Sequence, residues 1–392
     1  MKPMLLTSAA LSLLAISPAL AGQAEHDPYS LNMRLRHETV DQDGLPETAS
    51  ALTLRTRFGL QTPPRDGVTF LVEAENTVHL IDNFADTVAP RPGYPVVADP
   101  EVTELNRFQI DWRGDSGVGV TIGRQWFVMD DQRFAGPVGF RQNSQSVDAI
   151  RLRSGHVWPV ALDYAYIDRV HRIFGDDHPA GEFDSASHAA EARGETPLGT
   201  LSAFGLLLDF ENAPGLSSQT YGLRLTGTHE AVAYRLEYAR QFAHAGNTAS
   251  FELDYLRVEG DYDAGHYTVG GGIEILGGDG ITGFQTPLAT LHKFQGAADV
   301  FLNTPADGLR DIYLRGQWSF PHAVPGPLSL GFAWHDFASD DGGTGYGSEI
   351  DLVAGLSLTE RVSAEAKAAV FDGDAGGPVD RTKIWLSLVF DY

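Results

Sequence analysis

Apolar and polar side chains alternate with a period of two residues along most of this chain, and this pattern limits the folds open to it. In residues 107–113, Phe108 and Ile110 fall on one face, whereas Arg107 and Asp111 fall on the other. A second clear example is residues 311–320. Successive side chains of a β-strand point to opposite faces. Each alternating segment therefore predicts a strand with one apolar and one charged face.

The first residues indicate export from the cytoplasm. Lys2 precedes a short apolar run that ends in Ser17-Pro18, and Ala19-Leu20-Ala21 fits a cleavage site. We expect residues 1–21 to be a signal peptide and residues 22–392 to form a single domain. A transmembrane anchor is the weaker alternative because the apolar run is short. The chain has no cysteine, so disulfides are excluded.

The end of the chain points to a particular kind of exported protein. Residues 382–392, TKIWLSLVFDY, resemble the C-terminal strand of bacterial outer-membrane barrels, whose terminal aromatic residue is recognised by the barrel assembly machinery. A soluble β-sandwich could end in such a strand, but it would bury the apolar face under a second sheet. We therefore expect an integral protein of the Gram-negative outer membrane, with lipid, lipopolysaccharide and the assembly machinery as partners. The apolar face comprises Ile384, Leu386, Leu388, Phe390 and Tyr392.

Counting strands backwards from this end predicts about eighteen of them. Outer-membrane barrels have an even strand number, short periplasmic turns and longer outer loops. With the last strand ending in the periplasm, short turns such as TPPRDG fall inside and long connections such as residues 126–145 fall outside. The fold predicted is an all-β, antiparallel up-and-down transmembrane barrel with long extracellular loops, one or more of which fold into the lumen. A barrel of this size encloses an aqueous channel.

Arginine dominates the basic residues of the predicted inner face. Of the 28 basic residues, only Lys2, Lys293, Lys367 and Lys383 are lysine. The guanidinium group matches carboxylates and keeps its charge, so a row of arginines suits a pore for anions. Cross-links to inward acidic residues are an equal alternative, and the candidates are Asp111, Asp163, Glu237, Glu252 and Asp254. The predicted pore-lining residues are Arg34, Arg36, Arg55, Arg57, Arg107, Arg113, Arg133, Arg141, Arg151, Arg153, Arg169, Arg224, Arg235 and Arg315.

Residues 291–305 depart from the alternation. Phe294, Ala298 and Phe301 recur at helical spacing, and a Thr-Pro-Ala-Asp-Gly turn follows. We expect a short amphipathic helix in an outer loop, with its apolar face on the barrel wall and its polar face towards the lumen. An external helix that only covers the rim is the alternative. The constriction residues predicted here and in the loop around residues 130–141 are Asp130, Asp131, His292, Lys293, Gln295 and Asp299.

Four segments resemble one family of outer-membrane porins, the alginate-export family. They are GRQWFVMDDQRFAGPVGFRQNSQSVDAIRL, RVHRIFGDDHPAGEFDSASHAA, TPLGTLSAFGLLLDFENA and LHKFQGAADVFLNTPADGLRDIYL, in that order along the chain. The resemblance implies an eighteen-stranded porin with an electropositive, arginine-lined pore, through which the type member exports an anionic polysaccharide.

These observations predict a channel for anionic solutes, and they leave several substrates open. The first reading is export of an anionic polysaccharide such as alginate; the alternatives are a passive porin for small organic anions or oligosaccharides, an outer-membrane barrel enzyme and an adhesin. The acidic glycine-rich fragments lack the terminal Glu of a calcium loop, and no hydrolase or phosphate-loop motif is present. We expect no catalytic residue, cofactor, metal site or nucleic-acid partner.

Overall fold

The computed structural model describes residues 28–155 and 159–392, and the predicted signal peptide lies outside these residues. Eighteen strands make up the fold: β1 (Tyr29–Gln42), β2 (Ala49–Gln61), β3 (Val68–Asn83), β4 (Val102–Arg113), β5 (Gly119–Gln125), β6 (Ser146–Arg153), β7 (Val160–His171), β8 (Glu182–Thr196), β9 (Gly199–Leu208), β10 (Ser218–His229), β11 (Val232–Ala243), β12 (Glu252–Asp263), β13 (Tyr267–Leu276), β14 (Leu309–Phe320), β15 (Leu328–Ala338), β16 (Gly345–Ser357), β17 (Val362–Gly373) and β18 (Arg381–Asp391). Two short 3-10 helices, Pro214–Leu216 and Leu291–Lys293, lie in loops. In the described part of the chain, no helix is long and apolar enough to cross a membrane.

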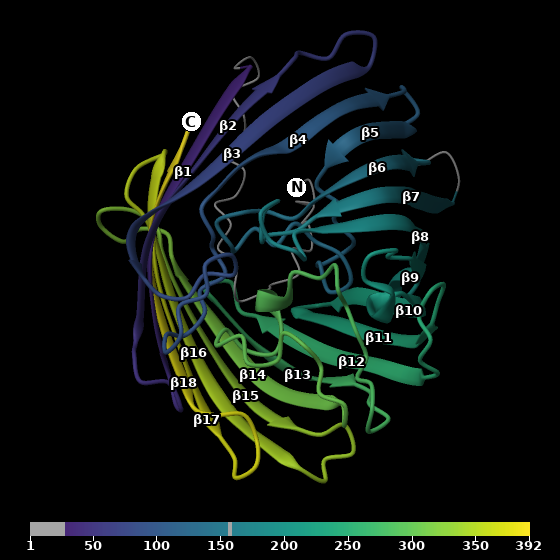
Figure 1. The fold of residues 1–392 in the computed structure, drawn as a ribbon. Helices are drawn as coiled ribbons and strands as arrows, with labels where there is room; N and C mark the ends of the chain where they lie inside the picture. Colours follow the sequence, from purple (N-terminus) through teal and green to yellow (C-terminus); the bar gives the residue numbers. More distant parts are fainter. Residues whose placement is uncertain (1–27, 156–158) are drawn as a thin grey trace.

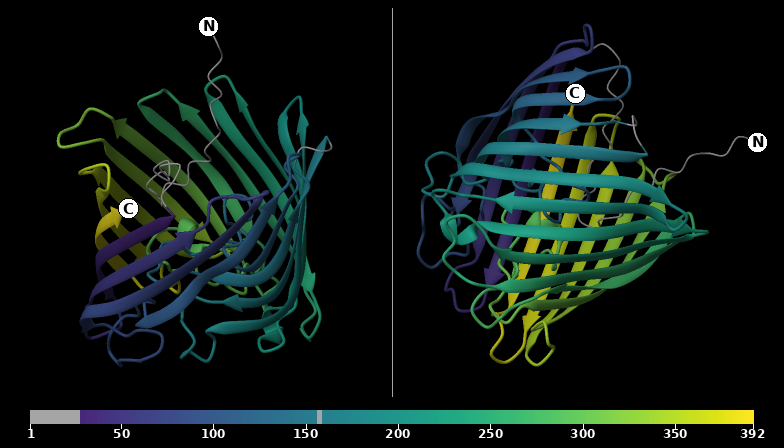
Figure 2. Two further views of the ribbon diagram at one scale, coloured as in Figure 1. Left: turned by 90° about the horizontal axis from the view of Figure 1, so that it is seen from above. Right: turned by 90° about the vertical axis from the view of Figure 1, so that its right-hand side faces the viewer.

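The strands form one closed antiparallel sheet, as the sequence predicts. Each strand pairs with its neighbours in the chain, and β1 closes the barrel by pairing with β18, with Met33 opposite Phe390. Figure 1 looks into this barrel, and Figure 2 shows the strands running obliquely around it. Closure satisfies the backbone hydrogen bonds of the first and last strands, which an open sheet would leave unpaired in lipid. The predicted eighteen-stranded barrel is confirmed.

The two faces of the wall differ as the alternation predicts. On β14, Leu314 is 57% exposed on the outer face, whereas Asp311 on the inner face is 1% exposed. On β18, Leu386 is 54% exposed, whereas Lys383 and Trp385 are buried. Lipid favours the apolar face, because charges there would cost about 2–4 kcal/mol at the bilayer midplane. An eighteen-stranded barrel with this outer surface is an integral protein of the Gram-negative outer membrane.

Two of the predicted inward acids lie on the other face. Glu252 and Asp254 are exposed on β12, and Arg240 of the neighbouring strand pairs with both at 2.6 and 2.8 Å. The inward residues of this strand are Leu253, Tyr255 and Arg257, which are all buried. The prediction was wrong because Glu252 and Asp254 share parity with the outward Leu256, and polar residues are tolerated outside near the strand end.

The core lies inside the barrel, between the wall and three long loops (Figure 1). Residues 84–101 place Phe84 and Val97 against β1 and β2. The other two loops, residues 126–145 and 277–308, bring buried apolar side chains against those of the strands. Phe134 and Phe284, one from each loop, pack together with Tyr255 of the wall.

Candidate pore constriction

Residues 126–145 form a loop that is fixed to β1, β2 and β3 by polar contacts. Arg34 donates hydrogen bonds to Gln142 Oε1 and to the carbonyl oxygen of Phe140, both at 2.8 Å. Gln142 in turn donates to Thr53 Oγ1 at 2.7 Å. The backbone N–H of Ser144 donates to Glu75 at 2.8 Å. These contacts hold one end of the loop against the first three strands.

The same loop reaches the far wall at β11, β12 and β13. Asp130 accepts from Arg235, and Asp131 accepts from Arg257, both at 2.6 Å. Arg133 pairs with Glu274 of β13, and both side chains are almost fully buried. Burial by itself would raise the pKa of Asp131, but Arg257 and Arg235 outweigh this effect and hold that pKa well below its usual range. The loop therefore spans the interior from β1–β3 to β11–β13.

Residues 277–308 form the second inward loop and contact β16, β17 and β18. The amides of Ala297 and Ala298 donate to Asp351 and Glu349 at 3.1 and 2.7 Å. Arg381 donates to the carbonyl oxygen of Asp299 at 3.0 Å. Backbone groups of the loop are thus paired with charged side chains of the wall.

The two loops join each other inside the barrel, and we call them together the partition (residues 126–145 and 277–308). Gly136 N donates to the Leu288 carbonyl at 2.9 Å, and Lys293 Nζ donates to the Asp131 carbonyl at 2.9 Å. Arg141 of the first loop donates to Asp299 of the second at 2.8 Å. The structure therefore brings together the two segments from which the sequence predicts a constriction.

The partition differs from the predicted helix. Only Leu291–Lys293 is helical, as a single 3-10 turn. Gln295 and Asp299 have φ of 53° and 58°, and Gly296 has φ of 79°, in the left-handed region that an α-helix excludes. Phe294, Ala298 and Phe301 are buried as expected. The spacing of these three residues reflects the packing of an irregular segment on the wall. Backbone amides that a helix would pair internally donate instead to wall carboxylates.

Three polar side chains that the sequence directs to the lumen are instead buried: His292, Gln295 and Asp299. The ring of His292 stacks on Phe140 with 3.4 Å between centroids, and its Nδ1 lies 2.7 Å from Asp299. Burial lowers the pKa of His292 well below its usual value, and Lys367 acts in the same direction. Lys367 Nζ lies 2.6 Å from His292 Nε2. Since an ammonium group can only donate, Nε2 accepts and the proton of the neutral ring is on Nδ1.

The fourteen arginines predicted to line the pore fall into two groups. Ten form ion pairs with carboxylates, which supports cross-linking as one role of this residue type. The ten are Arg36, Arg57, Arg107, Arg133, Arg141, Arg151, Arg169, Arg224, Arg235 and Arg315. Within residues 28–155 and 159–392, the other four have no carboxylate within ion-pair distance: Arg34, Arg55, Arg113 and Arg153.

Arg169 is not on the inner face, contrary to the prediction. The pairing of β7 with β8 shifts register between Ile167 and Arg169. Ile167 and Val170 are both buried in the core, so Arg169 points to the opposite side, where Glu182 and Asp184 pair with it. A β-bulge reverses the parity of the residues that follow it, and counting by twos misses this reversal.

Sequence reasoning did not select several basic residues that hold the partition. Lys383 donates to Asp299 at 2.8 Å, and Lys367, Arg381 and Arg257 make the contacts described above. All three lysines of the described residues, Lys293 included, contact the partition. Lysine is otherwise rare in the chain, and this rarity could have drawn attention to these positions.

Arg113 and Arg153 form a basic pair at one end of the inner wall. Both lie at the short-turn end of the barrel, directly opposite Gly119, which pairs with Arg113 on one side and Arg153 on the other. A Cβ added to Gly119 would lie 3.7 Å from Arg153 Nε and 3.9 Å from Arg113 Cγ. A side chain at this position would therefore contact both arginines, and glycine leaves them without one between them. Arg113 is exposed, and Arg153 is half-buried with one hydrogen bond to Thr121.

Comparison with known proteins supports the fold and leaves the family open. No model of a known protein family matches the sequence, and no curated protein is similar enough to match it. The resemblance to the alginate-export family is therefore not supported. Among solved structures, Pseudomonas aeruginosa OpdK with vanillate has a TM-score of 0.70 at 13% identity, covering 93% of this chain and 99% of that one. Pseudomonas aeruginosa OccK9 (OpdG) gives 0.70 at 11% identity, and Acinetobacter baumannii OccAB4 gives 0.68 at 12%; each comparison covers 93% of this chain and 98% of the other. These proteins are outer-membrane porins, and this chain has their fold.

Proposed function

We propose that this protein is a passive porin for small organic anions. The observation that carries the proposal is the Arg113–Gly119–Arg153 row, where two guanidinium groups without a carboxylate partner in the described chain flank a glycine on the inner wall. A forked guanidinium binds a carboxylate through two parallel hydrogen bonds. Two such forks on either side of a glycine suit an anion that stays bound briefly and then leaves.

The partition limits the size of the solute. It runs from β1–β3 to β11–β13 and on to β16–β18, and it is held by hydrogen bonds and buried ion pairs. An obstruction held in this way leaves less room for a polymer than for a small ion. This favours small anions over export of an anionic polysaccharide. OpdK, which shares the fold, was solved with vanillate, a small aromatic carboxylate.

Paired arginines contribute less to selectivity than unpaired ones. An ion pair such as Arg151–Asp163, at 2.6 Å, is close to neutral from a distance. Arg34 and Arg55 instead hydrogen-bond neutral groups, Gln142 and Asn32 respectively, and have no carboxylate within ion-pair distance in the described residues. A lumen with excess positive charge raises the local concentration of anions. We therefore expect anion selectivity even though the whole chain has a formal net charge of -24.

Reversal potentials in planar bilayers test this proposal. The double variant Arg113→Gln/Arg153→Gln should insert normally, because neither side chain has an ion pair to lose, and its reversal potential should shift towards cations. The control is Arg240→Gln, which removes one positive charge by the same substitution from the outer face and should leave the potential unchanged. An unshifted potential in the double variant would refute the assignment of selectivity to this row.

The rival functions give different results in the same apparatus. Current blocks that lengthen with the length of added alginate fragments would favour polysaccharide export. A correctly folded protein without any conductance would favour an adhesin, and turnover of lipid or peptide by the purified protein would reveal an enzyme.

A further inference from the structure

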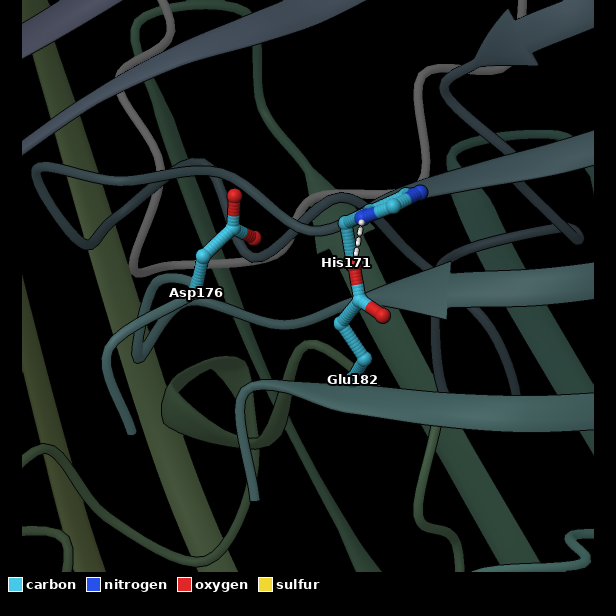
Figure 3. Close-up of side chains that lie close together, drawn as sticks. All are labelled: His171, Asp176 and Glu182. Carbon is cyan, nitrogen blue, oxygen red and sulfur yellow. Dashed lines mark ion pairs between the residues drawn. The ribbon is translucent and has the colours of Figure 1, made fainter. Parts of the chain in front are cut away.

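A cluster of one histidine and several carboxylates lies at the loop end of β7 and β8, far from the Arg113–Gly119–Arg153 row. His171 is the last residue of β7, Glu182 is the first of β8, and Asp176 lies in the loop between them. Figure 3 shows His171 and Glu182 in contact with Asp176 nearby. One potential ligand atom from each of the three residues lies within 4.8 Å of the others. His171 is 5% exposed.

Both ring nitrogens of His171 face carboxylate oxygens. Nε2 lies 2.9 Å from Asp148 Oδ2, and Nδ1 lies 3.1 Å from Glu182 Oε1. A neutral imidazole has one N–H and one lone pair, so one of these contacts would set a lone pair against an anion. A second proton, or a metal cation between the ring and one of the carboxylates, would resolve this opposition.

The position of Asp176 favours a metal cation over a second proton on His171. Its carboxylate is the third negative group at the site, and within the described residues its side chain has no ion pair or hydrogen bond. A proton on His171 would account for Asp148 and Glu182 but would leave the exposed Asp176 carboxylate to solvent. A divalent ion would be bound by His171, Glu182 and Asp176 together and would hold the loop that carries Asp176 against the two strands.

The surrounding residues orient the ligands as metal sites require. Asp148 accepts from Nε2 of His171, which leaves the Nδ1 lone pair for the metal; this carboxylate–histidine–metal arrangement is common in protein sites. Arg124 donates to Asp148 at 2.9 Å, and Arg169 donates to Glu182 Oε2 at 3.1 Å, so Glu182 Oε1 stays available. Each of the two wall ligands thus has its own supporting contact.

We infer that His171 Nδ1, Glu182 and Asp176 bind a divalent transition-metal ion of the zinc type. One imidazole nitrogen and two carboxylate oxygens fit zinc better than calcium, which takes oxygen ligands only. Water would fill the remaining position. The ion fixes the loop of residues 172–181 to the wall, which goes beyond the proposed transport function.

The position of the loop of residues 172–181 suits a metal ion that holds it to the wall. It lies over β5 and β6, which have 7 and 8 residues and are shorter than the 9–11 residues typical of a membrane-crossing strand. The Asp176 amide donates to Glu104 of β4 at 3.2 Å, so the loop bridges from β7 towards β4 across the short strands. A metal-fixed loop would complete the wall at this point.

Zinc titration of the purified, detergent-folded protein after chelator treatment tests the inference. Isothermal titration calorimetry at neutral pH should show one zinc ion per chain. His171→Ala and Glu182→Gln should abolish this binding, and Asp148→Asn should weaken it by about 10–100-fold because it acts through the histidine. Zinc should also slow tryptic cleavage after Arg172 in the parent protein.

The matched control is Asp177→Asn, which removes the same charge from the neighbouring position but lies outside the cluster; it should bind zinc like the parent. Heat-modifiable migration on gels establishes that each variant is a folded barrel. A parent protein that binds no zinc, or a His171→Ala variant that binds it equally well, would overturn the inference and leave a doubly protonated His171 as the explanation of the geometry.

Discussion

Asp299→Asn is the substitution that most directly tests how the partition is held. The Asp299 carboxylate accepts from Arg141 and Lys383 at 2.8 Å each and from His292 at 2.7 Å. These side chains are at most 7% exposed. Because Lys367 donates to the other nitrogen of His292, Nδ1 must keep its proton. An asparagine side chain would then present its NH₂ group either to that N–H or to the two cations, so one donor must face another.

The magnitude follows from the burial of this network. Breaking a buried ion pair by removing one partner costs about 3–5 kcal/mol. Arg141 and Lys383 would each still have Glu38, at 3.4 and 3.8 Å, so we expect the lower end, about 3 kcal/mol. Since about 1.4 kcal/mol corresponds to a factor of ten, the open population of the second loop should rise roughly 100-fold.

Hydrogen exchange measured by mass spectrometry can report this change, because exchange of a protected amide follows local opening. The amides of Ala297 and Ala298, bound to Asp351 and Glu349, should exchange faster by that factor, and single-channel currents should become larger and noisier. Asp279→Asn is the control: it is exposed in the same loop, and an asparagine oxygen can still accept from Ile281 and Thr282. Equal exchange in Asp299→Asn and the parent would refute the reasoning.

Two further predictions concern the same loop. The pKa of His292 is lowered in the closed loop, so opening takes up a proton below about pH 6.5. The closed form should therefore be fully stable above that pH and lose up to about 1.4 kcal/mol per pH unit below it. Faster exchange of the Ala297 amide in acid, absent in His292→Gln, would show this, and pH-independent exchange in the parent would contradict it. Gly296→Ala should loosen the loop by about 1–3 kcal/mol, because Gly296 has φ of 79° and an added Cβ would lie 2.5 Å from the Glu349 carboxylate. Gly139→Ala, where a Cβ meets nothing within 4 Å, is its control, and equal exchange in the two variants would count against the prediction.

The barrel could be predicted because its determinants are local. Period-two alternation marks each strand, turn residues mark each connection, and the even count of strands allows the first and last to pair antiparallel. None of these signals depends on contacts between distant parts of the chain. Arg169 shows the limit of this approach, since a single bulge reversed its face. The spacing of Ile167 and Val170, three residues apart and both buried, was the only trace of that bulge in the sequence.

The partition could be predicted in position but not in conformation. The apolar residues Phe294, Ala298 and Phe301 correctly indicate a segment that packs on the wall. Its backbone, however, is set by Glu349 and Asp351, which lie about fifty residues further along the chain and accept the amides of Ala298 and Ala297. Local periodicity cannot report partners at that distance, so a helix was the natural prediction and an irregular segment the outcome. The same reason explains why Lys367 and Lys383 were not selected.

The division of the arginines into paired and unpaired groups changes where selectivity should be sought. Arg57 and Arg107 are tied to Glu75 and Glu73, so replacing them would disturb the wall as well as the field in the lumen. Arg113 and Arg153 have no ion pair in the described residues, so replacing them should change only the field in the lumen. They lie on β4 and β6 with Gly119 of β5 between them, and a carboxylate in place of Thr121 or Gly119 could neutralise this pair. The inner wall instead has a glycine between two arginines that have no carboxylate within ion-pair distance in the described residues, and under the proposed function a small anion would supply the missing negative charge there.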